Sequence, residues 1–231
     1  MNLFYQPGIS EGINYLDLEE SRHAVRVLRM NEGDQLAITD GKGFFYSASI
    51  TKADSKKCQF EVQDKKSTAK RNFYIHIAIA PTKNADRIEW FVEKVTEIGI
   101  DEISFILCKN SERKVINKDR VEKIAVSAMK QSQQALLPKL NEIVPFKKIV
   151  EAMADQKFIG FVDSSNPLHL KALARPEKKY LILIGPEGDF SIEELEMAVN
   201  NGFEKVSLGT NRLRTETAGL VAAQVMALAN V

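Results

Sequence analysis

The sequence predicts an α/β protein in which a small β-barrel precedes a larger domain with a mostly parallel sheet. Residues 1–70 contain short alternating apolar segments separated by glycines, a pattern typical of antiparallel strands. From Asn72 onward, strand-like and helix-like segments alternate, as they do in βαβ units. The 231 residues are 44% hydrophobic and 27% charged, which excludes a disordered, collagen-like or coiled-coil chain.

In the first part, alternating apolar residues predict three strands after a short helical segment. The helical segment is expected at 21–28 and the strands at 34–39, 44–51 and 58–62. Asp40-Gly41-Lys42-Gly43 predicts a hairpin turn between the first two strands.

A polar and basic stretch, 64–71, is the expected linker between the two parts. The expected domains are therefore 1–70 and 71–231. In the second domain, strands are expected at 73–80, 102–107, 158–162, 180–184 and 203–208, and helices at 84–98, 118–134, 191–200 and 215–230. Gly99 and Gly202 follow two of these helices, where glycine commonly ends a helix.

The net charge of +1 hides an uneven distribution along the chain. Residues 71–150 carry +4, residues 151–231 carry −3, and residues 1–70 are neutral. A nucleic-acid-binding face is therefore expected on the first half of the second domain, because such faces carry basic excess.

The helix expected at 84–98 carries a stripe formed by Lys83, Arg87, Trp90, Lys94 and Glu97. Basic side chains with one aromatic ring suit phosphate contacts combined with base stacking. The alternative is a solvated face in which neighbouring glutamates pair with these cations, and periodicity alone favours it. Ser111 and Arg113, in the loop after a strand, can hold a phosphate or belong to a plain surface loop.

The stretch LILIGPEGDFSIEEL joins a buried strand to a firmly started helix. Gly185-Pro186-Glu187-Gly188 predicts a tight loop with exposed backbone groups, while Ser191 and Glu194 form a capping box. Phe190 and Leu195 can form the hydrophobic staple around it. A ligand loop is favoured over a plain connection at this place.

A second loop, VSLGTNRLRTETAG, contains Gly209, whose backbone can approach a ligand closely. Arg212 and Arg214 are the only cations in the last 26 residues. Thr215 is expected to cap the last helix, with Glu216 favoured at its positive end. Arg214 has no such structural role, so it is the strongest functional candidate.

Several classes of protein are disfavoured by missing motifs. The sequence has no P-loop, no GxGxxG after a strand, no HExxH and no GxSxG. The two cysteines and three histidines are scattered, so we expect no metal site. The longest uncharged run, 217–231, is too short to span a bilayer, and no signal peptide is visible, so a cytoplasmic location is expected.

Six ordered stretches resemble the bacterial 16S ribosomal RNA (uracil-N3) methyltransferase family, the RsmE type of the SPOUT superfamily. They are HAVRVLRMNEGDQL at 23–36, PTKNADRIEWFVEKVTEIGI at 81–100, SERKV at 111–115, AMKQS at 128–132, IGPEGDF at 184–190 and SLGTNRLRTETA at 207–218. The resemblance covers essentially the whole chain.

The resemblance implies a PUA-like, RNA-binding β-barrel followed by a SPOUT domain with a deep trefoil knot. It also implies a homodimer that binds S-adenosylmethionine in the loops 161–165, 184–188 and 208–217. The implied reaction is methylation of N3 of the uridine at conventional position 1498 of 16S ribosomal RNA in the small ribosomal subunit, without a metal and away from membranes.

Carried over residue by residue, the resemblance gives three sets of site residues. The cofactor set is Val162, Ile184, Gly185, Glu187, Gly188, Leu208, Gly209, Leu213 and Thr217. The RNA set is Lys83, Arg87, Lys94, Ser111, Arg113, Gln131, Arg26 and Arg29. Arg214 is expected to stabilise the uracil anion and Glu216 to accept the N3 proton.

The chain departs from the family pattern at two places. Asp189 stands where the family usually has a glycine, and Gln133 and Gln134 stand where it often has glycine and arginine. Three alternatives stay open at this point: a SPOUT enzyme with another RNA target, a non-catalytic ribosome-assembly factor, and an α/β enzyme that binds a small phosphorylated metabolite.

Overall fold

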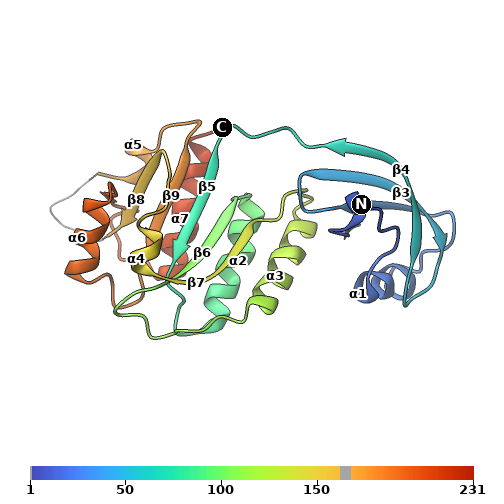
Figure 1. Cartoon of the computed structure of the whole chain (residues 1–231), viewed down its shortest axis with the longest axis horizontal. Coiled ribbons are helices and arrows are strands. Elements are labelled where there is room, and N and C mark those ends of the chain that lie inside the picture. Colours follow the sequence, from blue (N-terminus) through green and yellow to red (C-terminus); the bar gives the residue numbers. More distant parts are fainter. Residues whose placement is uncertain (1, 162–167) are drawn as a thin grey trace. The chain divides into compact units, whose positions relative to one another are not determined.

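The computed structural model describes residues 2–161 and 168–231 (Figure 1). The chain forms two compact units. The first unit comprises Met1–Lys70 and Val126–Leu137, and the second comprises Arg71–Ala125 and Pro138–Val231. The expected domain limits place 126–137 in the second domain, whereas the structure groups this segment with the first unit.

The first unit contains a four-stranded sheet of order β1-β2-β3-β4. Its strands are β1 (Leu3–Tyr5), β2 (Gln35–Thr39), β3 (Phe44–Lys52) and β4 (Gln59–Ser67). β1 runs parallel to β2, and the other neighbours are antiparallel. Backbone bonds also join Asn14 to Phe60 and Leu16 to Cys58, so the segment that begins with β1 reaches β4 as well. One stretch of chain thus supplies the outer strand β1 and also bonds to the opposite outer strand, β4.

The turn and the linker of the first unit had different outcomes. The turn between β2 and β3 is confirmed, since Asp40 Oδ1 accepts the N–H groups of Lys42 and Phe44 at 2.7 and 3.2 Å. The linker expected at 64–71 is wrong in its first half, because β4 continues to Ser67. The charged residues that suggested a linker are exposed on an edge strand, where charges discourage pairing with other chains.

The helical part of the first unit consists of η1 (Ile9–Glu11) and α1 (Leu18–Arg22), which continues as the π-helical turn η2 (His23–Val27). Segment 126–137 joins this unit through bonds from Gly43 N–H to the Ala135 carbonyl and from Leu137 N–H to the Gly41 carbonyl. Lys130 also forms an ion pair with the buried Glu20.

The second unit contains a six-stranded sheet of order β10-β8-β9-β5-β6-β7, and every strand pair among the described residues is parallel. The strands are β5 (Tyr74–Ile79), β6 (Glu102–Leu107), β7 (Lys139–Pro145), β8 (Gln156–Gly160), β9 (Lys179–Ile184) and β10 (Glu204–Val206). The predicted parallel sheet is confirmed. The sequence did not predict β1, which has three residues, or β7, a half-buried edge strand without a strong apolar pattern.

Among the described residues, six α-helices lie between or after the strands of this sheet in the order of the chain. They are α2 (Ala85–Ile98), α3 (Lys118–Gln131), α4 (Phe146–Ile149), α5 (Leu170–Leu173), α6 (Ile192–Asn200) and α7 (Thr215–Leu228). The capping box of Ser191 and Glu194 is present at α6. α3 ends before the expected residue 134, because Gln133 adopts a left-handed conformation with φ of 57°.

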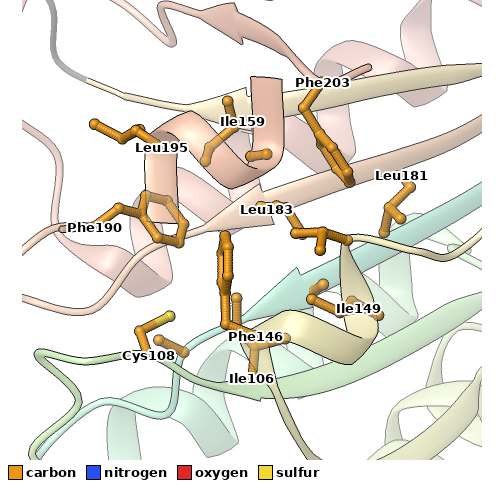
Figure 2. Close-up of a cluster of buried hydrophobic side chains, with 14 residues drawn as sticks. Ile106, Cys108, Phe146, Ile149, Ile159, Leu181, Leu183, Phe190, Leu195 and Phe203 are labelled. Atoms are coloured by element: carbon orange, nitrogen blue, oxygen red, sulfur yellow. The ribbon is translucent and has the colours of Figure 1, made fainter. Parts of the chain in front are cut away.

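Two apolar layers cover the sheet of the second unit. Figure 2 shows the layer beside α4 and α6, where Phe146, Leu183 and Phe190 point toward one another. The rings of Phe146 and Phe190 are 5.6 Å apart. Because side chains alternate along a strand, the intervening residues of β5 and β9 face α7, against which α2 packs. Burial on both faces fixes the strand ends, and therefore the loops that follow them.

Candidate functional site

A cavity of about 890 Å³ lies where β8, β9 and β10 end. Its walls come from the ends of these strands, from the loop 185–189 after β9, and from the loop 207–214 before α7. The carboxyl edge of a parallel sheet is the usual place for a ligand in α/β proteins. Both loops that the sequence singled out therefore meet around one cavity.

The loop after β9 is held by close contacts and hydrogen bonds. A Cβ on Gly185 would lie 3.0 Å from the Phe190 ring, and a Cβ on Gly188 would lie 3.1 Å from Asn110 Cβ. Asn110 Nδ2 donates to the carbonyls of Gly188 and Asp189 at 3.0 Å each. A side chain at either position would therefore crowd its neighbour.

Asp189, the departure from the family pattern, lines the cavity in a left-handed conformation with φ of 62°. Its Oδ1 accepts the N–H of Phe190 at 2.8 Å, and its own N–H donates to the Pro186 carbonyl at 2.9 Å. Aspartate tolerates this region better than most residues because its side chain can bond the nearby backbone. The loop thus keeps its turn without the usual glycine.

The second loop ends at the first turn of α7. The sequence suggested Thr215 as the N-cap of α7, and this prediction is wrong. The N-cap is Arg214, which has an extended conformation and makes no side-chain capping bond. The Thr215 hydroxyl instead donates to the Gly185 carbonyl at 3.0 Å. This hydrogen bond between distant segments joins the two loops.

Most of the expected cofactor residues are brought together. Six of the nine line the cavity: Ile184, Gly185, Glu187, Leu208, Gly209 and Leu213. Gly188 and Thr217 are not among its lining residues, and Val162 lies outside the described residues. Lining residues that the sequence did not single out include His169, which caps α5 and bridges to Ser207. That bridge depends on tertiary structure and leaves no local signal.

The two expected catalytic residues have different surroundings. Arg214 is exposed and lines the cavity, as does Arg212. Among the described residues, no hydrogen bond or ion pair involves either guanidinium. Glu216 does not line the cavity. Its side chain is buried, and its Oε1 lies 3.7 Å from Nε of Arg87.

The expected RNA-binding residues of the second unit are partly occupied by neighbours. Ser111 is buried, and its hydroxyl accepts the Cys108 N–H at 3.0 Å. Arg113 donates to the carbonyls of Thr82 and Lys83, so it braces the loop before α2.

The remaining members of the RNA set are exposed or paired at the surface. Lys94 bonds Glu93 and Glu97 on its own helix at 2.7 and 2.9 Å, while Lys83 pairs with Glu112 at 2.9 Å. Arg26, Arg29 and Gln131 are exposed residues of the first unit.

Lys83, just before α2, also bonds to a residue of the cavity wall. Its backbone N–H donates to Glu187 Oε1 at 2.9 Å.

Among the described residues, we find no group of three or more acidic, histidine or cysteine side chains able to hold a metal ion. Within the same residues, every helix is too short or too polar to cross a membrane.

The fold and the cavity belong to a class that two family models describe. Residues 69–227 match the model of an RNA methyltransferase domain, and residues 16–63 match that of an RNA methyltransferase PUA domain. The class that fold and site define is therefore that of RNA methyltransferases with a preceding PUA domain.

Relatives narrow the class further. The chain is 32% identical over 221 residues to ribosomal RNA small subunit methyltransferase E of Buchnera aphidicola subsp. Acyrthosiphon pisum, covering 90% of this chain and 85% of that protein. The Bacillus subtilis protein of that name is 29% identical, with 88% and 85% covered. The chain belongs to the ribosomal RNA small subunit methyltransferase E family.

Solved structures agree with this assignment. A probable rRNA-methyltransferase from Porphyromonas gingivalis has a TM-score of 0.94 at 44% identity, with 100% of this chain and 98% of that chain covered. Ribosomal RNA small subunit methyltransferase E from Neisseria gonorrhoeae, bound to S-adenosyl methionine, has a TM-score of 0.83 at 26% identity, covering 98% and 96%. The resemblance read from the six sequence stretches is thus confirmed at the level of the family.

Proposed function

We propose that this protein transfers a methyl group from S-adenosylmethionine to N3 of the uridine at conventional position 1498 of 16S ribosomal RNA, in the cytoplasm. The observation that carries the proposal is the cavity at the ends of β8, β9 and β10, where the loops 185–189 and 207–214 meet and Arg214 lines the wall. Relatives named for the small ribosomal subunit, and one solved with the cofactor bound, support the substrate and the cofactor.

The residues present fit this cofactor. A cavity of about 890 Å³ lies within the usual range for ligand pockets, roughly 300–1,000 Å³. Ile184, Leu208 and Leu213 provide apolar walls for an adenine ring. Gly209, with φ of 142° and open space at its Cβ position, exposes its backbone to a ligand. When bound, the cofactor supplies an electrophilic methyl group on its sulfonium.

The side chains of this protein then have to make uracil N3 nucleophilic. N3 carries an imide proton, which passes to solvent water, and the anion that remains is stabilised by a nearby cation. Arg214 is suited to this role because its guanidinium is exposed at the cavity without a protein partner among the described residues.

The remaining family properties are part of the same proposal. The first domain, 1–70, would bind RNA as a PUA-like barrel, with Arg26 and Arg29 exposed. The second domain, 71–231, would hold the knot and form the homodimer. The apolar last helix α7, with its half-exposed Leu220, Val221 and Val225, suits a subunit interface.

Mapping of modified uridines in 16S ribosomal RNA tests the proposal directly. RNA from cells with the gene is compared with RNA from cells in which the gene is deleted and then restored. We expect N3-methyluridine at one position, its loss on deletion and its return on restoration. Methylation that persists in the deletion strain, or that changes at another base atom, would contradict the assignment.

A further inference from the structure

Glu216 has an unusual environment for a proton acceptor. It lies in the first turn of α7, and its side chain is 9% exposed. Oε1 faces Arg87, whereas Oε2 is buried without a hydrogen-bond partner among the described residues. A buried carboxylate oxygen without a donor is unfavourable, so the charge depends on the cation beside it. Among the described residues, Glu216 forms its ion pair with Arg87.

The crossing of α2 and α7 sets this pair. A Cβ on Gly219 would lie 2.5 Å from Cε2 of Phe91, so the two helices touch at that point. Arg87 precedes Phe91 by one helical turn, and Glu216 precedes Gly219 by nearly one turn. Because the crossing is packed closely, the positions of the carboxylate and the guanidinium follow from it.

The outer side of Arg87 remains available. Its side chain is 38% exposed, and the ion pair engages Nε. Among the described residues, the two terminal nitrogens of its guanidinium have no hydrogen-bond or ion-pair partner. A guanidinium held on one edge by a carboxylate presents its other edge as a fixed fork, which suits the oxygens of a phosphate.

We propose that Glu216 is a positioning residue that orients Arg87 toward an RNA phosphate, and that it does not accept the uracil N3 proton. A general base must reach the proton it removes, directly or through one water. Glu216 is absent from the cavity walls, whereas its neighbour Arg214 lines them. This inference rests on the proposed RNA substrate, but it does not depend on the methylated atom.

The test compares Glu216→Gln, Arg87→Ala and the double variant in the full chain. Binding of a 16S ribosomal RNA fragment is measured against salt concentration, and methyl transfer to small subunits is measured against pH. Arg87→Ala should reduce the salt slope by about 1. Glu216→Gln should weaken RNA binding severalfold and raise KM similarly, with kcat within about twofold and the same pH profile. The double variant should bind RNA no more weakly than Arg87→Ala, because both changes remove one function.

Glu89→Gln is the matched control, since Glu89 on α2 pairs with Arg120 and takes no part in the proposal. Additive effects on RNA affinity, or a loss of kcat by a hundredfold or more with an ionisation missing from the pH profile, would overturn the proposal. If Glu216→Gln does not fold, Arg87→Lys replaces it: it keeps the charge but removes Nε, and unchanged RNA affinity would contradict the positioning role. Because RNA binding is measured without turnover, failure of the methyl-transfer proposal would be visible separately.

Discussion

The hydroxyl of Thr215 donates a hydrogen bond to the carbonyl of Gly185 over 3.0 Å. This bond joins the first turn of α7 to the loop that follows β9, although the two residues are 30 positions apart in the sequence. Both residues line the cavity, so the bond fixes the spacing of its two walls.

Thr215→Val should therefore weaken cofactor binding as well as stability. The substitution keeps the shape of the side chain but leaves the Gly185 carbonyl without its donor, which costs about 1–2 kcal/mol. We expect S-adenosylmethionine affinity, measured by calorimetry, to fall about three- to tenfold. Thr68→Val is the control: it removes an equal 3.0 Å bond, to Gly43 in the first unit, and should lower stability without changing cofactor affinity.

Arg214→Ala should fold and bind S-adenosylmethionine but lose methyl transfer. Removing a group that stabilises a developing anion typically lowers kcat about 100- to 1,000-fold. A tritiated-methyl assay on small subunits measures the loss, and calorimetry checks cofactor binding. Arg212→Ala removes an equal charge from the same cavity and should cost less than about tenfold. Near-normal turnover of Arg214→Ala would remove this residue from the mechanism.

Asp189 offers a test of backbone strain beside the cavity. At φ of 62°, alanine lacks both the freedom of glycine and the hydrogen bond that aspartate makes to Phe190. Asp189→Ala should therefore be less stable than Asp189→Gly by about 1–2 kcal/mol, measured by urea unfolding. Asp189→Asn keeps an acceptor oxygen and should lie close to the unsubstituted protein. Equal stability of the alanine and glycine variants would show that the turn relaxes.

Gly219→Ala should loosen the crossing of α2 and α7. Alanine normally stabilises a helix relative to glycine, but here its Cβ would meet the Phe91 ring at 2.5 Å. We expect a loss of about 1–3 kcal/mol in thermal unfolding and weaker RNA binding through Arg87. Gly8→Ala is the comparison, since its Cβ meets Cδ1 of Ile13, the end of a flexible side chain that can move. A stabilised Gly219→Ala variant would contradict the close crossing.

Glu102 predicts sensitivity to acid. Burial alone would raise its pKa, but hydrogen bonds from Asn141 and Lys139, the charge of His76 and a bond from Tyr74 together lower the pKa to about 2. Because the folded pKa is below the ordinary 4.5, the stabilisation is present above about pH 4.5 and is lost as the pH falls toward 2.

The lowering of the pKa from 4.5 to about 2 corresponds to a contribution on the order of 3 kcal/mol to the free energy of unfolding. Solvent screens this contribution little, because the Glu102 side chain is 14% exposed. Glu102→Gln should flatten the decline of stability below pH 4.5, followed by urea unfolding at each pH. Burial also lowers the pKa of His76, so the native state resists protonation there and loses further stability below about pH 6.5. Glu193→Gln is the control, because that exposed carboxylate is screened by solvent and should change the profile little.

Local patterns in the sequence were sufficient for much of the second unit. Alternating strands and helices predicted the parallel sheet, and β6 spans the expected residues 102–107. The capping box of Ser191 and Glu194 was predictable because both residues act within one helical turn. The two loops of the cavity were also recognisable, since their glycines and arginines stand out from the surrounding apolar segments.

Tertiary structure decided what the local patterns could not. Thr215 is the first helical residue of α7, after the N-cap Arg214, and its hydroxyl donates to the distant carbonyl of Gly185. The segment 126–137 joins the first unit through backbone bonds to the β2–β3 turn, which no local pattern encodes. β7 is stabilised by pairing with β6 and not by its own apolar pattern.

The sequence by itself thus determined the family, most strands and helices of the second unit and the two loops that line the cavity, because these patterns depend on residues close together in the chain. Only the tertiary structure showed that Arg214 and Glu216, two residues apart, have different surroundings. Arg214 is exposed at the cavity, whereas Glu216 is buried against Arg87. The reason is geometric: at the start of a helix, residues two apart point in different directions, and the packing of α2 decides which of them is covered.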